Sequence, residues 1–414
     1  MKTLQTIVVI VLFTTASALF AKSSVNKSND EVFIYGKITT TSNKKYTGAI
    51  RWGKEEVFWS DMFNSTKTEN EYLDNLSRRE RRKLDENSGN IKIFGLNVVT
   101  RGNSGSHDHT FACQFGDIQS IEIKGRNRVK LYLKNGELFR LSGGSNDIGA
   151  TVKILDEEIG LVELKWDRID KVEFMKTQGE LQAKFGRPLF GKVKTFYGDF
   201  AGFVQWDHDE RVGDDELDGD SKDGDVSILF KKITSIEKQG RGSLVTLDSG
   251  RELYLKGSND VNKENRGIIV TMPGMARVDI KWRDFRSVVF DQTSGVFGLA
   301  YDDFAKPKKL WGTVSTTDGK NYSGRLVYDL DEAWDFEILQ GNDDDLEYNI
   351  PFRFIKKITP KSFKSALIEL RNGEQLRLEG SQDVNENNDG VLIFEKKNDS
   401  TWVPWENIEE VEFK

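Results

Sequence analysis

The chain has 414 residues, a formal net charge of −7 and 31% charged residues. Its single cysteine, Cys113, excludes an intramolecular disulfide framework, and one cysteine with three histidines is a poor ligand set for structural zinc. Cys113 lies in an apolar stretch, so we expect a buried, inert thiol. The acidic balance argues against nucleic acid as the main partner.

The first 21 residues are typical of a secretory signal peptide. Lys2 precedes an apolar run at residues 7–13, and Ala16-Ser17-Ala18 fits a cleavage pattern, with a cut after Ala21 as a second option. The competing interpretation is an N-terminal strand or anchor helix. The run is too short to span a bilayer, and we expect no transmembrane segment after signal removal. The mature protein is therefore predicted to be exported, either periplasmic or secreted.

The rest of the chain repeats one pattern three times. A Gly-Ser-Asn-Asp or Gly-Ser-Gln-Asp turn is followed each time by a tryptophan-led segment that ends in phenylalanine. Such self-similarity indicates that one structural unit was duplicated. The turns lie at residues 144–147, 257–260 and 380–383, and the pattern places the repeats at 29–176, 187–291 and 307–414.

Each repeat is predicted to consist of short antiparallel strands. β-branched and aromatic residues alternate with polar ones, and Gly, Asn and Asp turns interrupt them, as in the segment that begins at Gly36. The order hairpin, strand, strand, closing strand occurs twice within a repeat. Five short strands suit a small SH3-like or Sm-like barrel. We therefore predict an all-β chain of three tandem repeats, each a pair of small barrels or half-barrels with a shared core.

Residues 66–90 form an insertion specific to the first repeat. Their sequence predicts a helix that starts near Thr68 and stops before Gly89, with an apolar stripe that includes Leu76. One interpretation is a solvated helix docked by its leucines; the other is a contact for an anionic partner, such as a phosphate-bearing lipid surface or an acidic polysaccharide. The basic candidates for that contact are Arg78, Arg79, Arg81, Arg82 and Lys83.

Acidic residues gather in loops of the second and third repeats. Carboxylates at alternating positions of Gly-containing loops suit Ca²⁺, which takes roughly six to eight oxygen ligands, although the spacing differs from an EF-hand. The alternative is solvated acidic loops that keep edge strands apart. In the first repeat, Gly53 replaces the first aspartate. The candidate ligands are Asp207, Asp209, Glu210, Asp215, Asp218, Asp220, Asp223 and Asp225, with Asp329, Asp331 and Glu332 in the third repeat.

Two further sets of repeated residues are candidates for binding. Aromatic residues precede the acidic loops, and they are expected either to stack on a ligand or to fill the cores. Aspartates end the repeated turns, where they either cap the turn or bind a ligand. The aromatic residues are Trp52, Trp206 and Tyr328, and the aspartates are Asp147, Asp260 and Asp383.

Together these patterns favour an exported, non-enzymatic binding or scaffold protein of the cell envelope or extracellular space, with a protein or polysaccharide partner. The aromatic-plus-acidic loops at residues 206–210 and 328–332 are the favoured contact surface, and several weak sites in one chain would gain avidity. One alternative is a hydrolase that uses these carboxylates on glycan or phosphoester bonds. Another is a structural spacer whose basic helix makes the contact. The pattern leaves the oligomeric state open, and also whether the first repeat shares the function of the others.

Overall fold

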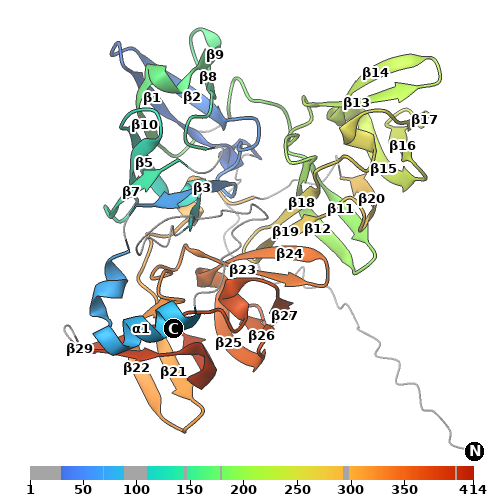
Figure 1. Ribbon diagram of the computed structural model, residues 1–414. Coiled ribbons are helices and arrows are strands. Elements are labelled where there is room, and N and C mark those ends of the chain that lie inside the picture. Colours follow the sequence, from blue (N-terminus) through green and yellow to red (C-terminus); the bar gives the residue numbers. More distant parts are fainter. Residues whose placement is uncertain are drawn as a thin grey trace, which may run out of the picture.

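The computed structural model describes residues 29–68, 70–87, 110–143, 147–177, 180–291, 298–396 and 399–414. This part of the chain is built of antiparallel strands with short helices between them, in three lobes (Figure 1), which confirms the all-β prediction. Within the described ranges, no helix is both long and apolar enough to cross a membrane. The predicted signal peptide at residues 1–21 lies outside the described residues.

The described part of each repeat contains ten strands. Repeat 1 has β1 (Tyr35–Thr40), β2 (Lys45–Trp52), β3 (Met62–Lys67), β4 (Thr110–Gln114), β5 (Ile118–Ile123), β6 (Arg128–Leu133), β7 (Leu138–Ser142), β8 (Val152–Asp156), β9 (Gly160–Leu164) and β10 (Ile169–Phe174). Repeat 2 has β11 (Phe190–Thr195), β12 (Asp199–Trp206), β13 (Glu216–Ser221), β14 (Gly224–Leu229), β15 (Ile233–Gln239), β16 (Gly242–Leu247), β17 (Glu252–Leu255), β18 (Ile268–Met272), β19 (Ala276–Ile280) and β20 (Phe285–Phe290). Repeat 3 has β21 (Trp311–Thr316), β22 (Asn321–Tyr328), β23 (Ile338–Asp343), β24 (Leu346–Pro351), β25 (Ile355–Ser362), β26 (Ser365–Leu370), β27 (Gln375–Glu379), β28 (Val391–Lys396), β29 (Asp399–Val403) and β30 (Ile408–Phe413).

Short helices connect the strands. The α-helix α1 (Arg78–Asn87) lies between β3 and β4. The described 3-10 turns are η1 (Asn29–Val32), η2 (Glu71–Asn75), η3 (Phe115–Asp117), η4 (Trp166–Arg168), η5 (Phe230–Lys232), η6 (Asn259–Val261), η7 (Tyr301–Asp303), η8 (Phe352–Phe354), η9 (Gln382–Val384) and η10 (Trp405–Asn407).

The two halves of each repeat exchange strands. In repeat 1, hairpin β1–β2 from the first half pairs with β10 and β8 from the second half. Hairpin β6–β7 from the second half pairs with β5 and β3 from the first. The resulting order, β4-β3-β7-β6-β5-β10-β1-β2-β8-β9, is open at both ends. The described strands thus form large antiparallel sheets, and none of the small barrels that the sequence left open beside half-barrels is closed, because alternation decides which face of a strand is buried but not which strand lies beside it.

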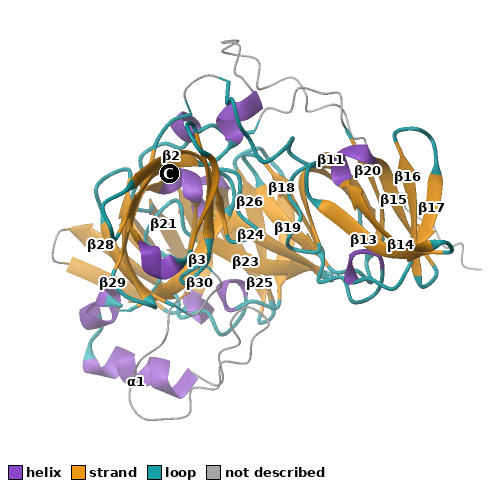
Figure 2. Ribbon diagram, turned by 90° about the horizontal axis from the view of Figure 1, so that it is seen from above, coloured by secondary structure: helices purple, strands orange, loops and turns teal. Residues whose placement is uncertain are grey.

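Repeats 2 and 3 keep most of this pairing and are joined to each other, but β13 and β14 of repeat 2 form a two-stranded sheet of their own. β12 pairs with β18 and β22 with β28, as β2 pairs with β8. β19 also pairs with β24 of the next repeat, with Val278 opposite Tyr348, so both repeats belong to one 18-stranded sheet. Figure 2 shows β18 and β19 beside β24 between the two lobes.

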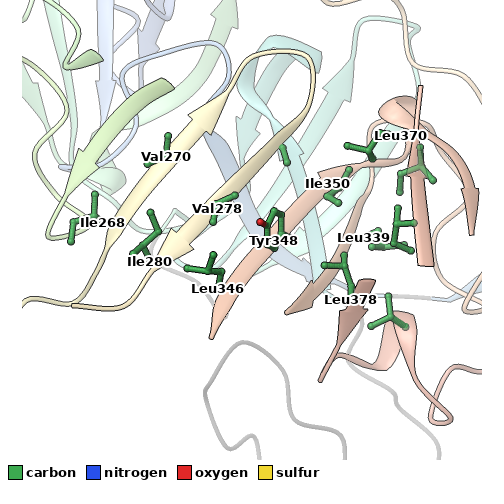
Figure 3. Packing of buried hydrophobic residues seen from close by; sticks show 14 of the residues in the cluster. Ile268, Val270, Val278, Ile280, Leu339, Leu346, Tyr348, Ile350, Leu370 and Leu378 are labelled. Atoms are coloured by element: carbon green, nitrogen blue, oxygen red, sulfur yellow. The ribbon is translucent and has the colours of Figure 1, made fainter. Parts of the chain in front are cut away.

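Repeats 2 and 3 share a hydrophobic core across this ladder. Val270, Val278 and Ile280 of repeat 2 lie beside Leu346 and Tyr348 of repeat 3 (Figure 3), and each side chain is at most 4% exposed. Full burial of one such aliphatic side chain contributes about 1.5–3 kcal/mol. The shared core therefore fixes the two repeats relative to each other.

Candidate functional site in the repeated acidic loops

A ten-residue loop segment begins at the last residue of the second strand of every repeat, at residues 52–61, 206–215 and 328–337. In repeat 2 the N–H of Trp206 donates to the Glu210 carbonyl at 2.9 Å, and the N–H of Glu210 donates back at 3.0 Å. The last carboxylate caps the loop, because Asp215 Oδ2 accepts from the N–H of Arg211 at 2.7 Å and of Val212 at 3.0 Å. Asp61 and Glu337 cap their own loops in the same way.

The residue after the aromatic takes a left-handed backbone conformation. Its φ is 45° at Asp207, 49° at Asp329 and 63° at Gly53. Glycine adopts this region freely, and Asp enters it more readily than most other residues. The substitution of Gly53 for aspartate in repeat 1 therefore keeps the shape of the loop while it removes one carboxylate.

The three repeated aromatic residues belong to the cores. Trp52, Trp206 and Tyr328 are 0% exposed. Trp52 and Trp206 each donate their indole N–H at 2.9 Å to the carbonyl of the aspartate that ends the repeated turn, Asp147 or Asp260. These rings cannot stack on a ligand, which corrects the prediction that they form part of a contact surface.

The three repeated aspartates connect the turn to the third strand of the repeat. Asp260 Oδ2 accepts from the backbone N–H of Asp218 at 2.7 Å. The corresponding bonds of Asp147 and Asp383, to the N–H of Asn64 and Gln340, are both 2.6 Å. The side chains thus stabilise the packing of turn against strand. Residues 144–146 of the first turn lie outside the described residues.

In repeat 2 the loop and the turn bring three carboxylates together. Oxygen atoms of Asp207, Glu210 and Asp260 lie within 4.8 Å of one another. Asp207 also accepts from the N–H of Arg266 at 2.5 Å and forms an ion pair with its guanidinium at 3.1 Å. Glu210 Oε2 is buried without a hydrogen-bond partner among the described residues, and so is Glu332 Oε2 at the same position of repeat 3. Hard cations such as Ca²⁺ bind oxygen ligands of this kind.

Crowding of carboxylates changes the ionisation of this cluster. Burial raises the pKa of Glu210 to about 9, and the neighbouring Asp260, Asp209 and Asp207 add to the effect. Burial also raises the pKa of Asp260 to about 6, against the effect of the Asp218 N–H. Near neutral pH, Glu210 therefore keeps a proton that a bound cation would displace.

The capping carboxylates also join different repeats. Each one binds a cation from another repeat: Asp61 with Arg211, Asp215 with Arg51 at 2.6 Å, and Glu337 with Lys67 at 2.7 Å. Lys67 also binds Asp331 at 2.7 Å, and Asp209 binds Arg266 at 2.7 Å within its own repeat. The carboxylates of Asp61, Asp215, Asp331 and Glu337 thus lie at contacts between repeats rather than in solvated loops.

Asp218, Asp220, Asp223 and Asp225 lie on the hairpin that follows the loop, and the backbone N–H of Asp218 contacts the cluster through Asp260. Residues 216–229 form hairpin β13–β14, in which Asp220 is opposite Asp225. The side chains of Asp218, Asp220, Asp223 and Asp225 are all exposed. The structure therefore separates the predicted acidic loop into a packed part, up to Asp215, and an exposed hairpin.

The insertion of repeat 1 is helical, but the helix begins later than predicted. The turn η2 precedes α1, which starts at Arg78. Leu76 and Leu84 are buried in a hydrophobic cluster that contains residues of both repeat 1 and repeat 3, as the docked-helix interpretation expects. Arg78, Arg79, Arg81 and Arg82 are exposed, and Arg81 pairs with Asp74 at 3.1 Å; the side chain of Lys83 lies outside the described part.

Sequence reasoning missed the cations that bind these loops. Arg51, Lys67 and Arg211 lie beside or within the acidic segments, yet nothing in their spacing indicates a partner in another repeat. A signal existed in Arg211, because it is a charged residue at a position where repeats 1 and 3 carry the apolar Val57 and Ala333. A charge at an otherwise apolar position requires a partner once it is buried.

Comparisons with known proteins leave the family open. No family model and no curated protein matches this chain. A solved structure titled "Streptogramin B lyase structure" aligns at 9% identity over 72% of this chain and 94% of that chain, with a TM-score of 0.10. That score is too low to carry an argument. Fold and site define the molecule as an all-β repeat protein whose acidic loops join its repeats.

Proposed function

We propose that this is an exported, non-enzymatic binding or scaffold protein of the cell envelope or extracellular space, with a protein or polysaccharide partner. The proposal is supported by the contacts that the acidic loops make between repeats. Each capping carboxylate both closes its own loop and binds a cation of another repeat. Repeats fixed in this way present their outer surfaces in a constant arrangement, which suits a partner that spans more than one repeat.

We also propose that each five-strand unit is an SH3-like or Sm-like half-barrel. The units are β10-β1-β2-β8-β9 and β5-β6-β7-β3-β4. In both, the closing strand pairs with the first strand of a hairpin, and a 3-10 turn, η4 or η3, precedes the closing strand. Small units of this kind bury little surface alone, which explains why they share strands and cores.

An array of envelope glycans and proteins, incubated with the labelled mature chain, tests the binding function. We expect saturable binding that the variant Glu210→Gln retains, because Glu210 lies in a buried cluster. The carboxylate-dependent hydrolase is the alternative. Turnover of a glycan or phosphoester by the wild-type protein, with loss of that turnover in Glu210→Gln, would replace our proposal with the hydrolase.

A second candidate property is the binding of Ca²⁺ by Asp207, Glu210 and Asp260. It is supported by the proximity of their oxygens and by the unpartnered Glu210 Oε2. In repeat 1, Gly53 stands where Asp207 stands in repeat 2, so that position offers one carboxylate fewer.

Calorimetric titration of the chelator-treated mature chain with Ca²⁺, with Mg²⁺ as a control, tests this property. We expect saturable Ca²⁺ binding with release of a proton near neutral pH, because the pKa of Glu210 is raised to about 9 by burial. Glu210→Gln should abolish both signals. Absence of heat at millimolar Ca²⁺ would assign the three carboxylates a structural role alone.

A further inference from the structure

A groove of about 490 Å³ opens on repeat 3 beside β21 and β30. The ring of Trp311 at its rim is 53% exposed. One acidic residue, Asp335, lies in the groove and accepts from the N–H of Lys308 at 3.0 Å, while Arg353 is paired with Asp117 at 2.7 Å. Cationic and aromatic side chains line the rest of it, among them Lys308, Trp311, Phe352, Arg371, Phe413 and Lys414.

The same position can be identified in repeat 1 from equivalent backbone hydrogen bonds. The N–H of Lys134, just after β6, donates to the Asp117 carbonyl at 3.1 Å. The N–H of Arg371, just after β26, donates to the Phe354 carbonyl at 2.8 Å. Equivalent bonds match Val32 with Lys308, Tyr35 with Trp311, Trp59 with Asp335, Gly116 with Arg353, and Met175 with Lys414.

In repeat 1 this position is filled by a peptide segment of the chain itself. The ring of Tyr301 lies 4.6 Å from that of Trp59, and Phe304 packs on Gly116, where a Cβ would come within 2.3 Å of its ring. Lys134 Nζ donates to the Tyr301 carbonyl and, at 3.1 Å, to the Phe304 carbonyl. A cation at this position therefore holds a peptide that forms the 3-10 turn η7 by its backbone oxygens.

The segment in repeat 1 also carries an acidic side chain that meets a cation. Asp302 lies 2.8 Å from Lys176, the residue after Met175. The groove of repeat 1 thus accepts a short peptide that combines aromatic rings with carboxylates, and its own chain supplies that peptide.

In repeat 3 the corresponding groove is open, and its charge is higher. Lys308, Arg371 and Lys414 are all exposed, and they replace Val32, Lys134 and Met175 of repeat 1. Arg371 donates to the carbonyls of Arg353 at 2.9 Å and Lys414 at 3.1 Å, which leaves further guanidinium N–H groups free for an acceptor. By the same bonds, repeat 2 has Arg187 in place of Lys308, but Asp248 and Asp291 in place of Arg371 and Lys414, so its cations at this position are offset by carboxylates.

We infer that the groove of repeat 3 binds a short acidic peptide segment of a partner protein. Carboxylates of the peptide pair with Lys308, Arg371 and Lys414, and an aromatic or apolar side chain packs on Trp311. The inference rests on the proposed binding function and names the chemistry of one partner. The opposite charges provide the attraction, and the peptide lying at the equivalent position of repeat 1 provides the precedent for the binding mode.

Fluorescence anisotropy with a labelled peptide of residues 299–305, Leu-Ala-Tyr-Asp-Asp-Phe-Ala, tests this inference at low salt. We expect saturable binding to the mature chain, at least tenfold weaker for a peptide with Asn in place of both Asp. The double variant Arg371→Asp/Lys414→Asp, which carries the residues of repeat 2, should also bind at least tenfold more weakly. Lys364→Asp, an exposed cation on the β25–β26 turn, is the matched control and should bind as the wild type does.

Three results would overturn the inference. The first is that the acidic peptide does not bind to the wild-type protein. The second is that the Asn peptide binds as tightly as the acidic peptide. The third is that the double variant has the melting temperature of the wild type and still binds the acidic peptide as tightly. Binding of polygalacturonate in place of the peptide, lost in the double variant, would assign the groove to a polysaccharide instead. Failure of the peptide while the array finds a partner would refute the groove assignment alone and leave the binding function standing.

Discussion

Removal of Lys67 should weaken the contact between repeat 1 and repeat 3. Lys67 Nζ lies 2.7 Å from Asp331 Oδ1, 2.7 Å from Glu337 Oε1 and 3.0 Å from the Asp331 carbonyl. Its side chain is 11% exposed, and those of Asp331 and Glu337 are 10% and 5% exposed. The variant Lys67→Met would leave two nearly buried carboxylates facing each other without a cation. Loss of one partner from a buried ion pair costs about 3–5 kcal/mol.

The assay is urea denaturation followed by tryptophan fluorescence. Burial raises the pKa of Glu337 and Lys67 opposes this, so loss of Lys67 should raise that pKa further. An acid whose pKa is higher in the folded state stabilises folding at low pH and loses this effect as pH rises. The defect of Lys67→Met should therefore be smaller at pH 5 than at pH 8.

Two further variants control this experiment. Lys320 lies 2.6 Å from Asp318, but both side chains are more than half exposed, so Lys320→Met should leave the midpoint unchanged within error. The triple variant Lys67→Met/Asp331→Asn/Glu337→Gln should recover most of the stability, because it removes the unpaired charges. A midpoint for Lys67→Met equal to that of the wild type would refute the conclusion that this contact joins the repeats.

Three other predictions concern the buried groups. Tyr328→Phe removes the hydroxyl that donates to the Asp383 carbonyl at 2.5 Å. The free energy of unfolding in urea should fall by about 1 kcal/mol, since Asn388 still donates to that carbonyl. An unchanged urea midpoint would contradict the assignment of this hydrogen bond. Because burial raises the pKa of Glu210 to about 9, its ionisation destabilises the fold progressively between pH 4.5 and 9. In chelator, the melting temperature of Glu210→Gln should therefore rise relative to the wild type from pH 5 to pH 9, and parallel pH profiles would speak against this. Burial raises the pKa of Cys113, so it should react with a disulfide reagent at pH 8 only in denaturant; rapid reaction of the native protein would show that the thiol is accessible.

Much of the candidate site could be anticipated from the sequence, but its role could not. The repeated positions of Trp206, Glu210 and Asp260 were visible as a pattern, and the structure brings their side chains together. Their burial was not visible, because an acidic loop has the same composition whether it faces solvent or another repeat. Arg211 and Arg51 show that the loops face another repeat, since each binds a carboxylate about 150 residues or more away in the sequence.

The sequence by itself determined the class of the fold, the repetition and the positions of most strands. Side-chain alternation and turn residues act within a few residues, so they can be identified without knowledge of the partner strands. Only the tertiary structure decided that β8 pairs with β2 and β3 with β7, and thus that the two halves of a repeat exchange strands. It also decided that the carboxylates join repeats and that repeat 1 fills a groove which repeat 3 leaves open. These features depend on contacts between residues far apart in the chain, whose energies come from burial and charge pairing that no local pattern encodes.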